Sequence, residues 1–407
     1  TPSMITNASL SLRKHRVFLN AFFFLLFAVE AHADIWGDFS YNVIDGTSVT
    51  ITGYTGSGGE VSIPSRINGL PVTSIGDLAF ASCDGLTGNL VIPEGITSIG
   101  WRAFSNCTGL DGTLTLPGTL KTIDAFAFDY CFRLTGNLGL PKGLTSINNG
   151  AFGLCRGFSG NLVIPEGVVS IGSDAFSLCI GLSGTLTLPG TLETIGEGAF
   201  SNCPLTGNVF IPAKLVSIGK GTFDRCNSMT GFTVHANNLA YSSAHGLLLS
   251  KDGKTVIKCP EGKTGSPVIP EGVTIIGDGA FYFCKKLTGN VLIPEGVMSI
   301  ERYAFACCTG LSSLTFTGNA PASVGSYAFS YQANDFLVYF RRGAVGFSTP
   351  AWTPYSEEIP CQMIPNHAPR FRIIGNKTIL AGQKITFEVI ADDEDVGDAL
   401  QYSATNP

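Results

Sequence analysis

The sequence has few charged residues. Asp, Glu, Lys and Arg make up only 14% of the 407 residues, against about 25% in an average soluble domain, and the formal net charge is −6. Because so weakly acidic a chain would not attract a phosphate backbone, nucleic acid is not an expected partner. Hydrophobic residues reach 44%, which is enough for a substantial core and argues against a disordered chain.

Residues and motifs typical of catalytic sites are also scarce. There are five histidines, and the sequence contains no Gly-x-Ser-x-Gly elbow, phosphate-binding loop, dinucleotide fingerprint or Cys-x-x-Cys pair. Glutamates recur after a proline, and paired carboxylates could hydrolyse sugars. Because they occupy a repeated turn, solvated turn residues are the simpler interpretation of Glu94, Glu166, Glu271 and Glu295. We therefore expect no enzyme, no catalytic residue and no cofactor in the repeats.

Glycine is abundant, and the excess follows a fixed period. There are 50 glycines, where average usage would give about 28, and they show no strict Gly-X-Y order, which excludes collagen. An aromatic residue recurs mostly every 24 residues, at Phe80, Phe104, Phe128, Phe152, Phe176, Phe200, Phe223, Phe281, Phe305 and Phe329. A period between 20 and 50 residues predicts a solenoid.

One repeat unit accounts for a complete coil. Leu90-Val91-Ile92 has the alternation of a short strand, and Pro93 ends it because proline cannot donate a ladder hydrogen bond. Ile99 buries a second side, Phe104 fills the middle of the coil, and the small Cys107 packs at the next corner. Since one coil cannot bury this face alone, stability must come from stacking. The predicted fold is a repeat solenoid with short parallel strands and about 24 residues per coil.

This pattern resembles the BspA-type leucine-rich repeats of secreted and surface proteins, from Asp34 to about Phe340. The resemblance implies a bacterial protein that adheres to an extracellular protein or to a cell-surface or matrix ligand, with carbohydrate as a further candidate. The sequence departs from the family spacing through a Gly-Asn or Gly-Thr insertion, as in Leu86-Thr87-Gly88-Asn89-Leu90. We expect that insertion to form a bulge or a wider corner.

Residues 1–33 have the features of a secretory signal peptide. The basic run Arg13–Arg16 precedes the apolar run Val17–Val29, and Ala31-His32-Ala33 predicts cleavage after Ala33. A membrane anchor is the alternative, but about 13 apolar residues fall short of the roughly 20 that a spanning helix needs. The expected location is therefore secreted or at the cell surface, with no transmembrane span.

The remaining chain divides into four parts. We expect an N-terminal capping hairpin and first strand at 34–78, and leucine-rich repeats at 79–340. A hairpin inserted at about 232–267 should protrude from the stack. Residues 341–366 are interpreted as a linker, and 367–407 as a truncated module.

The tail resembles the opening of an Ig-like or cadherin-like module, a partial all-β sandwich. Lys384–Val389 alternates with period 2, as a half-buried strand does. The acidic cluster that follows is the one plausible metal site, because hard oxygen donors suit calcium; a solvated turn is the other interpretation. Its members are Asp392, Asp393, Asp395 and Asp398.

Twelve cysteines in an exported chain suggest disulfides. Nine of them share one coil position, however, where small buried thiols would form a structural ladder. These are Cys83, Cys107, Cys131, Cys155, Cys179, Cys203, Cys226, Cys284 and Cys308. The off-phase Cys259, Cys307 and Cys361 are the better candidates for a disulfide or a reactive thiol.

The exposed side of the strand column is the candidate ligand-binding face. Its outward residues are Val91, Thr115, Val163, Thr187, Phe210 and Leu292, flanked by Asn89, Asn137, Asn161, Asn208 and Asn290. For the polar column, a contact surface and a hydrogen-bonded ladder are equally open. The preferred function is non-enzymatic protein binding or adhesion through this face, which we expect to be one extended parallel sheet. The alternatives are an accessory solenoid of a secreted hydrolase with its catalytic domain beyond residue 407, and a structural spacer.

Overall fold

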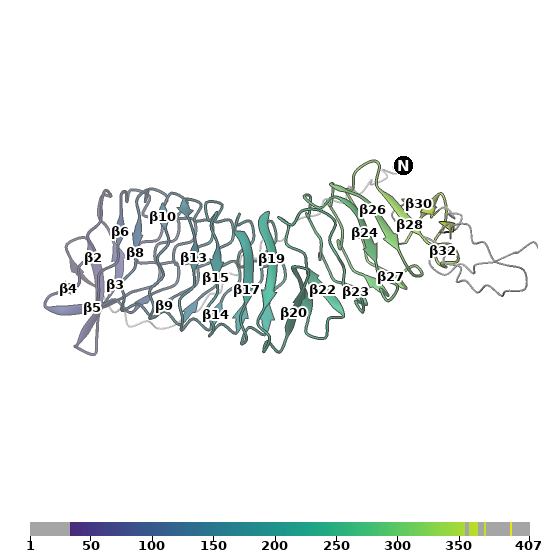
Figure 1. Ribbon diagram of the computed structural model, residues 1–407. Coiled ribbons are helices and arrows are strands. Elements are labelled where there is room, and N and C mark those ends of the chain that lie inside the picture. The colour runs from purple at the N-terminus through teal and green to yellow at the C-terminus, as the bar shows by residue number, and fades with distance from the viewer. Residues whose placement is uncertain (1–32, 355–357, 365–369, 372–390, 393–407) are drawn as a thin grey trace, which may run out of the picture.

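The computed structural model describes residues 33–354, 358–364, 370–371 and 391–392, and every regular element within these ranges is a strand. Figure 1 shows successive coils stacked side by side into one elongated body, with the N-terminal strands at one end and the strands after residue 330 at the other. Within the described ranges there is no helix long and apolar enough to cross a membrane.

An antiparallel ribbon covers the first coil. It is built from β1 (Asp34–Trp36), β2 (Phe39–Ile44) and β3 (Ser48–Tyr54). Asp45 and Gly46 are the central residues of a turn closed by the hydrogen bond from Thr47 N to Ile44 O at 3.0 Å, and both have positive φ, as a type I′ turn requires. Strand β3 then pairs in parallel with β5 (Leu70–Ile75), which also pairs with β4 (Arg66–Ile67). The ribbon thus covers a sheet edge that would otherwise be open.

The longest sheet runs along one side of the first stack. Each coil adds a two-residue strand with an exposed or half-buried Ser or Thr and an inward Ile, in parallel register such as Ser74 with Ser98. With the cap it has 11 strands. Its later members are β7 (Ser98–Ile99), β9 (Thr122–Ile123), β11 (Ser146–Ile147), β14 (Ser170–Ile171), β16 (Thr194–Ile195) and β18 (Ser217–Ile218).

The strand column chosen from the sequence as the binding face is interrupted. In the first stack it consists of pairs: β6 (Leu90–Val91) with β8 (Leu114–Thr115), β10 (Gly136–Asn137) with β12 (Phe158–Ser159), β13 (Leu162–Val163) with β15 (Leu186–Thr187), and β17 (Thr206–Ile211) with β19 (Ser228–Val234). The expectation of one extended sheet on this side was therefore wrong. Among the inserted glycines, Gly88, Gly136 and Gly160 have positive φ, and so does Gly207 in the paired strand β17. The expected bulge is confirmed at Gly207–Asn208.

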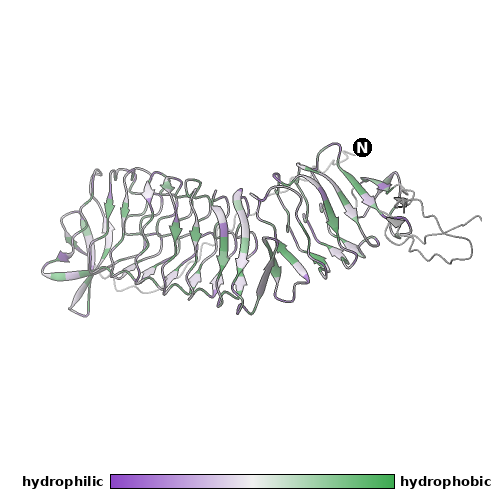
Figure 2. Ribbon diagram, in the orientation of Figure 1, coloured by the Kyte–Doolittle hydropathy of each residue, from purple (hydrophilic) through white to green (hydrophobic). Residues whose placement is uncertain are grey.

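A column of phenylalanine rings forms the core. The rings of Phe104 and Phe128 lie 5.3 Å apart with an interplanar angle of 0°, and Phe128 stacks on Phe152 at the same distance. These side chains are completely buried. Figure 2 shows hydrophobic residues recurring at corresponding places in successive coils. Each ring completes its burial only against the next coil, so the stack is held together by neighbour contacts.

The Ala-Phe-x-x-Cys segment of each coil, here called the arch, has two left-handed residues four positions apart. The first precedes Ala-Phe (Thr-Phe in one coil), at Leu78, Arg102, Phe126, Gly150, Asp174, Gly198, Gly221, Gly279, Tyr303 and Tyr327; the second occurs at Ser82, Asn106, Tyr130, Leu154, Leu178, Asn202, Arg225, Phe283, Cys307 and Tyr331. Left-handed backbone costs a non-glycine residue roughly 1 kcal/mol. Hydrogen bonds between arches offset this cost, as from Phe104 N to Ala127 O at 2.8 Å.

The insertion at about 232–267, here called the wall, lies inside the body between the two runs of repeats. The expectation that it would protrude from the stack as a hairpin was therefore wrong. Strand β21 (Leu247–Ser250) pairs antiparallel with β20 (Tyr241–Ala244) and β22 (Thr255–Lys258). Leu248 belongs to the core of the first stack, whereas Leu247 and Leu249 belong to the core of the second. A strand that is apolar on both faces must be covered on both. Strand β22 then begins a new parallel sheet with β23 (Ile275–Ile276), β25 (Ser299–Ile300) and β27 (Ser323–Val324).

The second stack extends further than the sequence predicted. Its other side is formed by β24 (Gly289–Ile293), β26 (Leu311–Phe316), β28 (Leu337–Phe340), β30 (Ile359–Met363) and β29 (Ala351–Trp352). The predicted linker at 341–366 therefore contains two strands of this sheet. Trp352, Ile359 and Cys361 are buried in the second core, and the indole of Trp352 lies 6.0 Å from the ring of Phe329 at the end of the aromatic column. This segment caps the stack.

The two termini lie largely outside the described residues. The expected signal peptide falls there except for Ala33, and so does most of the expected Ig-like module. Within that module the structure describes β31 (Arg370–Phe371) and β32 (Ala391–Asp392), which pair antiparallel.

Candidate binding surfaces

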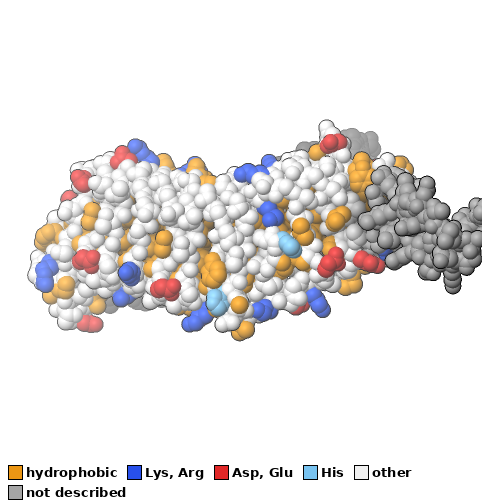
Figure 3. Space-filling view, viewed as in Figure 1, with side chains coloured by type: hydrophobic (Ala, Val, Ile, Leu, Met, Phe, Trp, Pro, Cys, Tyr) orange, Lys and Arg blue, Asp and Glu red, His pale blue; other side chains and the backbone are white. Residues whose placement is uncertain are grey.

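The apolar members of the predicted binding face are exposed. Val91, Val163, Phe210 and Leu292 retain 52%, 54%, 46% and 56% of their accessible surface, and Thr115 and Thr187 are exposed at the same strand position. The Phe210 ring meets the His235 imidazole edge to face at 6.1 Å. Figure 3 shows hydrophobic side chains spread along the length of the body over a largely uncharged surface.

The asparagines beside them bond to neighbouring coils. Asn89 Oδ1 accepts hydrogen bonds from Thr113 N at 2.8 Å and from its Oγ1 at 2.9 Å, and Asn161 does the same with Thr185. Asn208 Nδ2 donates to Thr233 Oγ1, and Asn290 Oδ1 accepts from Ser313 and Thr315. Asn137 is exposed in β10. These bonds favour the ladder interpretation for four of the five asparagines and leave the apolar residues available for contact.

All nine in-phase cysteines are free thiols. Most donate Sγ–H to the carbonyl oxygen of the preceding coil's phenylalanine, as Cys107 does to Phe80 O at 3.0 Å. The others in this pattern are Cys131, Cys155, Cys179, Cys203, Cys226 and Cys308. Cys284 donates instead to Cys259 O at 3.7 Å. Cys83, in the first coil, is only half-buried.

The environment of these thiols opposes nucleophilic chemistry. Burial raises the pKa of Cys83 to about 11, and it also raises the pKa of Cys155. Only thiolates are strong nucleophiles. Cys259 and Cys361, expected as candidates for a disulfide or a reactive thiol, are free and buried in the second core, while Cys307 is free and half-buried.

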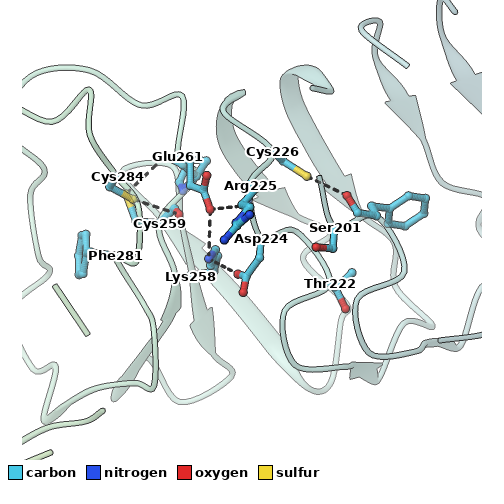
Figure 4. A network of polar contacts seen from close by, with 12 residues as sticks. Ser201, Thr222, Asp224, Arg225, Cys226, Lys258, Cys259, Glu261, Phe281 and Cys284 are labelled. Carbon is cyan, nitrogen blue, oxygen red and sulfur yellow. Dashed lines mark hydrogen bonds and ion pairs between the residues drawn. The ribbon is translucent and has the colours of Figure 1, made fainter. Parts of the chain in front are cut away.

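A buried polar network lies where the two stacks meet at the wall (Figure 4). Lys258, the last residue of β22, places Nζ 2.6 Å from Asp224 Oδ1 and 3.8 Å from Glu261 Oε1. Glu261 Oε1 also accepts the Arg225 backbone N–H at 2.7 Å. Asp224 and Arg225 belong to the last arch of the first stack, so the network joins that arch to the wall.

Burial sets the protonation of this network. Desolvation raises the pKa of Glu261 from its ordinary 4.5 to about 7, although Lys258 and the Arg225 N–H oppose the shift. For Lys258, burial lowers the pKa, but the carboxylates of Asp224 and Glu261 outweigh burial and leave the pKa above its ordinary value. Glu261 thus changes charge near neutral pH.

Two clefts lie against this network. The first, of about 510 Å³, is lined by residues that include Lys220, Asp278 and Arg302. An ion pair of 2.7 Å between Lys220 and Asp278 links the two stacks there. The second, of about 600 Å³, has walls from both stacks and is lined by Ile180, Asn202, Pro204, Arg225, Asn227, Glu261, Phe283, Lys285 and Lys286. We call the second one the basic cleft.

Sequence reasoning did not identify the basic cleft. Arg225 and Lys285 are far apart in the chain, and only the end of the first stack and the fold of the wall bring them together. The interrupted period between Phe223 and Phe281 was the available signal that the stack changes there.

No metal site is found among the described residues, where no three His, Cys, Asp or Glu side chains are grouped to hold an ion. The predicted calcium ligands Asp393, Asp395 and Asp398 lie outside these residues, and Asp392 is the last residue of β32.

Comparison with known proteins identifies the repeats. A family model described as a BspA type leucine rich repeat region matches residues 73–160, 158–245 and 261–340. A leucine rich cell surface protein from Faecalibacterium prausnitzii A2-165 is 28% identical and covers 77% of this chain and 90% of its own, with a TM-score of 0.65. No match was found among curated proteins.

Two further crystal structures share the fold alone. A leucine-rich repeat protein from Bacteroides ovatus is 24% identical over 82% of this chain and 100% of its own, with a TM-score of 0.50. The pneumococcal vaccine antigen PcpA is 18% identical over 76% of this chain and 81% of its own, with a TM-score of 0.51.

Proposed function

Because the chain belongs to the BspA-type leucine-rich repeat family, we propose that it is a non-enzymatic exported protein that binds other proteins at the cell surface through the face carrying Val91, Val163, Phe210 and Leu292. The similar protein from Faecalibacterium prausnitzii is described as a cell surface protein, which supports this location. The signal-like residues 1–33 support export.

The observation that carries the proposal is that Phe210 and Leu292 are exposed, while adjacent residues on the same strands are held in place by burial or by hydrogen bonds. Their neighbours Val209 and Val291 are completely buried, and Asn208 and Asn290 bond to the next coil. Each exposed side chain therefore projects from backbone that cannot turn it inward. Rigid apolar residues surrounded by uncharged surface are typical of the contact core of an interface.

The same coils offer matched controls on the opposite strands. Val216 is 51% exposed just before β18, in the coil of Phe210, and Met298 is 60% exposed just before β25, in the coil of Leu292. An aspartate at Val216 or Met298 should affect the stability of its coil about as much as one at Phe210 or Leu292. It lies, however, on the other side of the stack.

The test measures binding of the full chain to intact cells and to immobilised extracellular matrix proteins. We expect F210D/L292D to weaken binding at least tenfold and V216D/M298D to change it less than twofold, with both variants folded by circular dichroism. Loss of binding in V216D/M298D alone would place the contact on the opposite side of the two stacks, which carries β18 and β25. Unchanged binding in both variants would refute the proposed face and favour a spacer.

A further inference from the structure

The basic cleft is distinct from the exposed apolar face and has its own chemistry. One side of the cleft is formed by the last coils of the first stack, with Asn202, Pro204 and Arg225, and the other side by the second stack, with Phe283 and Lys285. Lys286 Nζ donates to Asn227 O at 2.9 Å and links the two sides. The cleft volume of about 600 Å³ lies in the range of ligand-binding pockets.

Two cations of this cleft, Arg225 and Lys285, lie against the Phe283 ring, and the carboxylate in its lining, Glu261, is paired with Lys258. The Arg225 guanidinium carbon lies 5.2 Å from the centre of the Phe283 ring, and Lys285 Nζ lies 4.9 Å from the same centre. The two positive charges are thus within about 10 Å of each other, roughly one Debye length at physiological ionic strength. Among the described residues, no carboxylate forms an ion pair with either of them.

The first cleft provides a direct contrast. There, Lys220 pairs with Asp278 at 2.7 Å and Lys258 pairs with Asp224 at 2.6 Å. Both clefts adjoin the same wall and both contain cations; the first cleft pairs two of its three cations with carboxylates, whereas neither Arg225 nor Lys285 in the basic cleft forms an ion pair within the described residues. In a chain with more acidic than basic residues, this arrangement leaves charge available for an external anion.

The remaining lining favours a peptide over a sugar. The Phe283 ring already carries the Arg225 and Lys285 cations, so it is not a free platform for stacking a sugar ring. Ile180, which is 53% exposed, and Pro204 offer apolar contact for an aliphatic side chain. Carboxylates beside an aliphatic side chain complement this set, because Arg and Lys bind carboxylates through charge-assisted hydrogen bonds.

From these observations we propose that the basic cleft binds an acidic peptide segment of a partner protein, with its carboxylates on Arg225 and Lys285 and an aliphatic side chain against Ile180 and Pro204. This goes beyond the proposed function, because it assigns a second site and the chemistry of its ligand. The two sites can be separated by mutation.

The test uses the full chain and a fluorescein-labelled octapeptide, Gly-Glu-Leu-Glu-Glu-Leu-Glu-Gly, followed by fluorescence anisotropy. We expect saturable binding that weakens at least tenfold between 50 and 300 mM salt, as well as in the R225Q/K285Q variant. K220Q in the first cleft removes one positive charge from the coil that also carries Arg225 and should change the dissociation constant less than twofold. F210D should also leave it unchanged, which separates this site from the apolar face.

Three results would overturn the proposal. The first is equal binding of the peptide in which every Glu is replaced by Gln, and the second is unchanged binding by R225Q/K285Q. The third is the failure of the acidic peptide to bind while tetragalacturonate does bind, which would assign the cleft to an acidic saccharide. Because both substituted side chains are exposed, unchanged melting temperatures should confirm that the variants are folded.

Discussion

At the scale of single residues, the Glu261 side chain supplies a hydrogen-bond acceptor that a following coil would otherwise provide. In the first stack, the second left-handed residue of each arch donates its N–H to a carbonyl of the next coil, as Asn202 N does to Asp224 O at 2.8 Å. After the last arch there is no further coil in that position, and Arg225 N donates to the Glu261 carboxylate instead. A side chain thus satisfies the terminal donor, which would otherwise lack the partner that the next coil supplies elsewhere.

This substitute makes stability depend on pH. The pKa of Glu261 is raised by burial from 4.5 to about 7, so the folded protein holds a proton that the unfolded chain has already released between these values. The contribution of Glu261 to stability is therefore largest at low pH and declines as pH rises from about 4.5 to about 7, by roughly 1.4 kcal/mol per unit of pKa displacement.

We expect E261Q, which keeps a neutral acceptor, to gain stability relative to the natural protein as pH rises from 5 to 8. The difference in melting temperature should grow by a few degrees over that range. The control is E271Q at an exposed turn, for which the difference should stay constant. A parallel pH profile for E261Q and the natural protein would show that Glu261 does not titrate in this range.

At the scale of the coil, the sequence predicted the stacking but not the path of the chain. The 24-residue spacing of Phe104 and Phe128 was sufficient to place a ring in every coil, because burial requires the same apolar position each time. The left-handed backbone of the arch could not be foreseen, since Leu154 and Tyr130 carry no local signal for it. Tertiary hydrogen bonds, not residue preference, impose that conformation.

Close approach between coils is another feature that only the structure reveals. A Cβ at Gly184 would lie 2.4 Å from Asn161 Oδ1 and 2.5 Å from the carbonyl carbon and oxygen of Gly160. A Cβ at Gly139 would meet no heavy atom within 4 Å. Both glycines belong to coils of the first stack, and only Gly184 is in close contact with the preceding coil, so they form a matched pair.

We expect G184A to destabilise the first stack by about 2–4 kcal/mol, because the backbone of the preceding coil must move. G139A should change stability by less than about 0.5 kcal/mol, since space is free. Urea unfolding of the full chain monitored by circular dichroism measures both. Equal effects would show that the coils adjust without cost.

At the scale of the whole molecule, the wall divides one continuous body into two cores. Successive leucines of β21 alternate between them, Leu248 in the first and Leu247 and Leu249 in the second. The sequence did not predict this division, because the wall lies outside the 24-residue period and its apolar run resembles any strand. The C-terminal cap was missed for the same reason, since Trp352 and Ile359 stand at no repeated position.

Substitutions of adjacent leucines should therefore act on different halves. We expect L248A to reduce hydrogen-exchange protection mainly in β17 and β19, and L249A mainly in β23 and β25, each costing about 2–5 kcal/mol locally. Hydrogen exchange followed by mass spectrometry measures this, and each variant is the control for the other. Equal loss of protection in both halves from either change would mean that the two cores unfold as one unit.

The arches also give the solenoid a net dipole along its long axis. In the strands of the sheets, neighbouring peptide groups point in opposite senses and their dipoles largely cancel. In the arches, Leu78, Phe80 and Ser82 all donate N–H toward the next coil, to Trp101, Ala103 and Ser105, so these dipoles add. As in a helix, such a row carries partial positive charge at its N–H end. In the first stack that end meets the Glu261 carboxyl group, so ionisation of Glu261 puts a negative charge at the positive pole of a dipole parallel to the long axis of the solenoid.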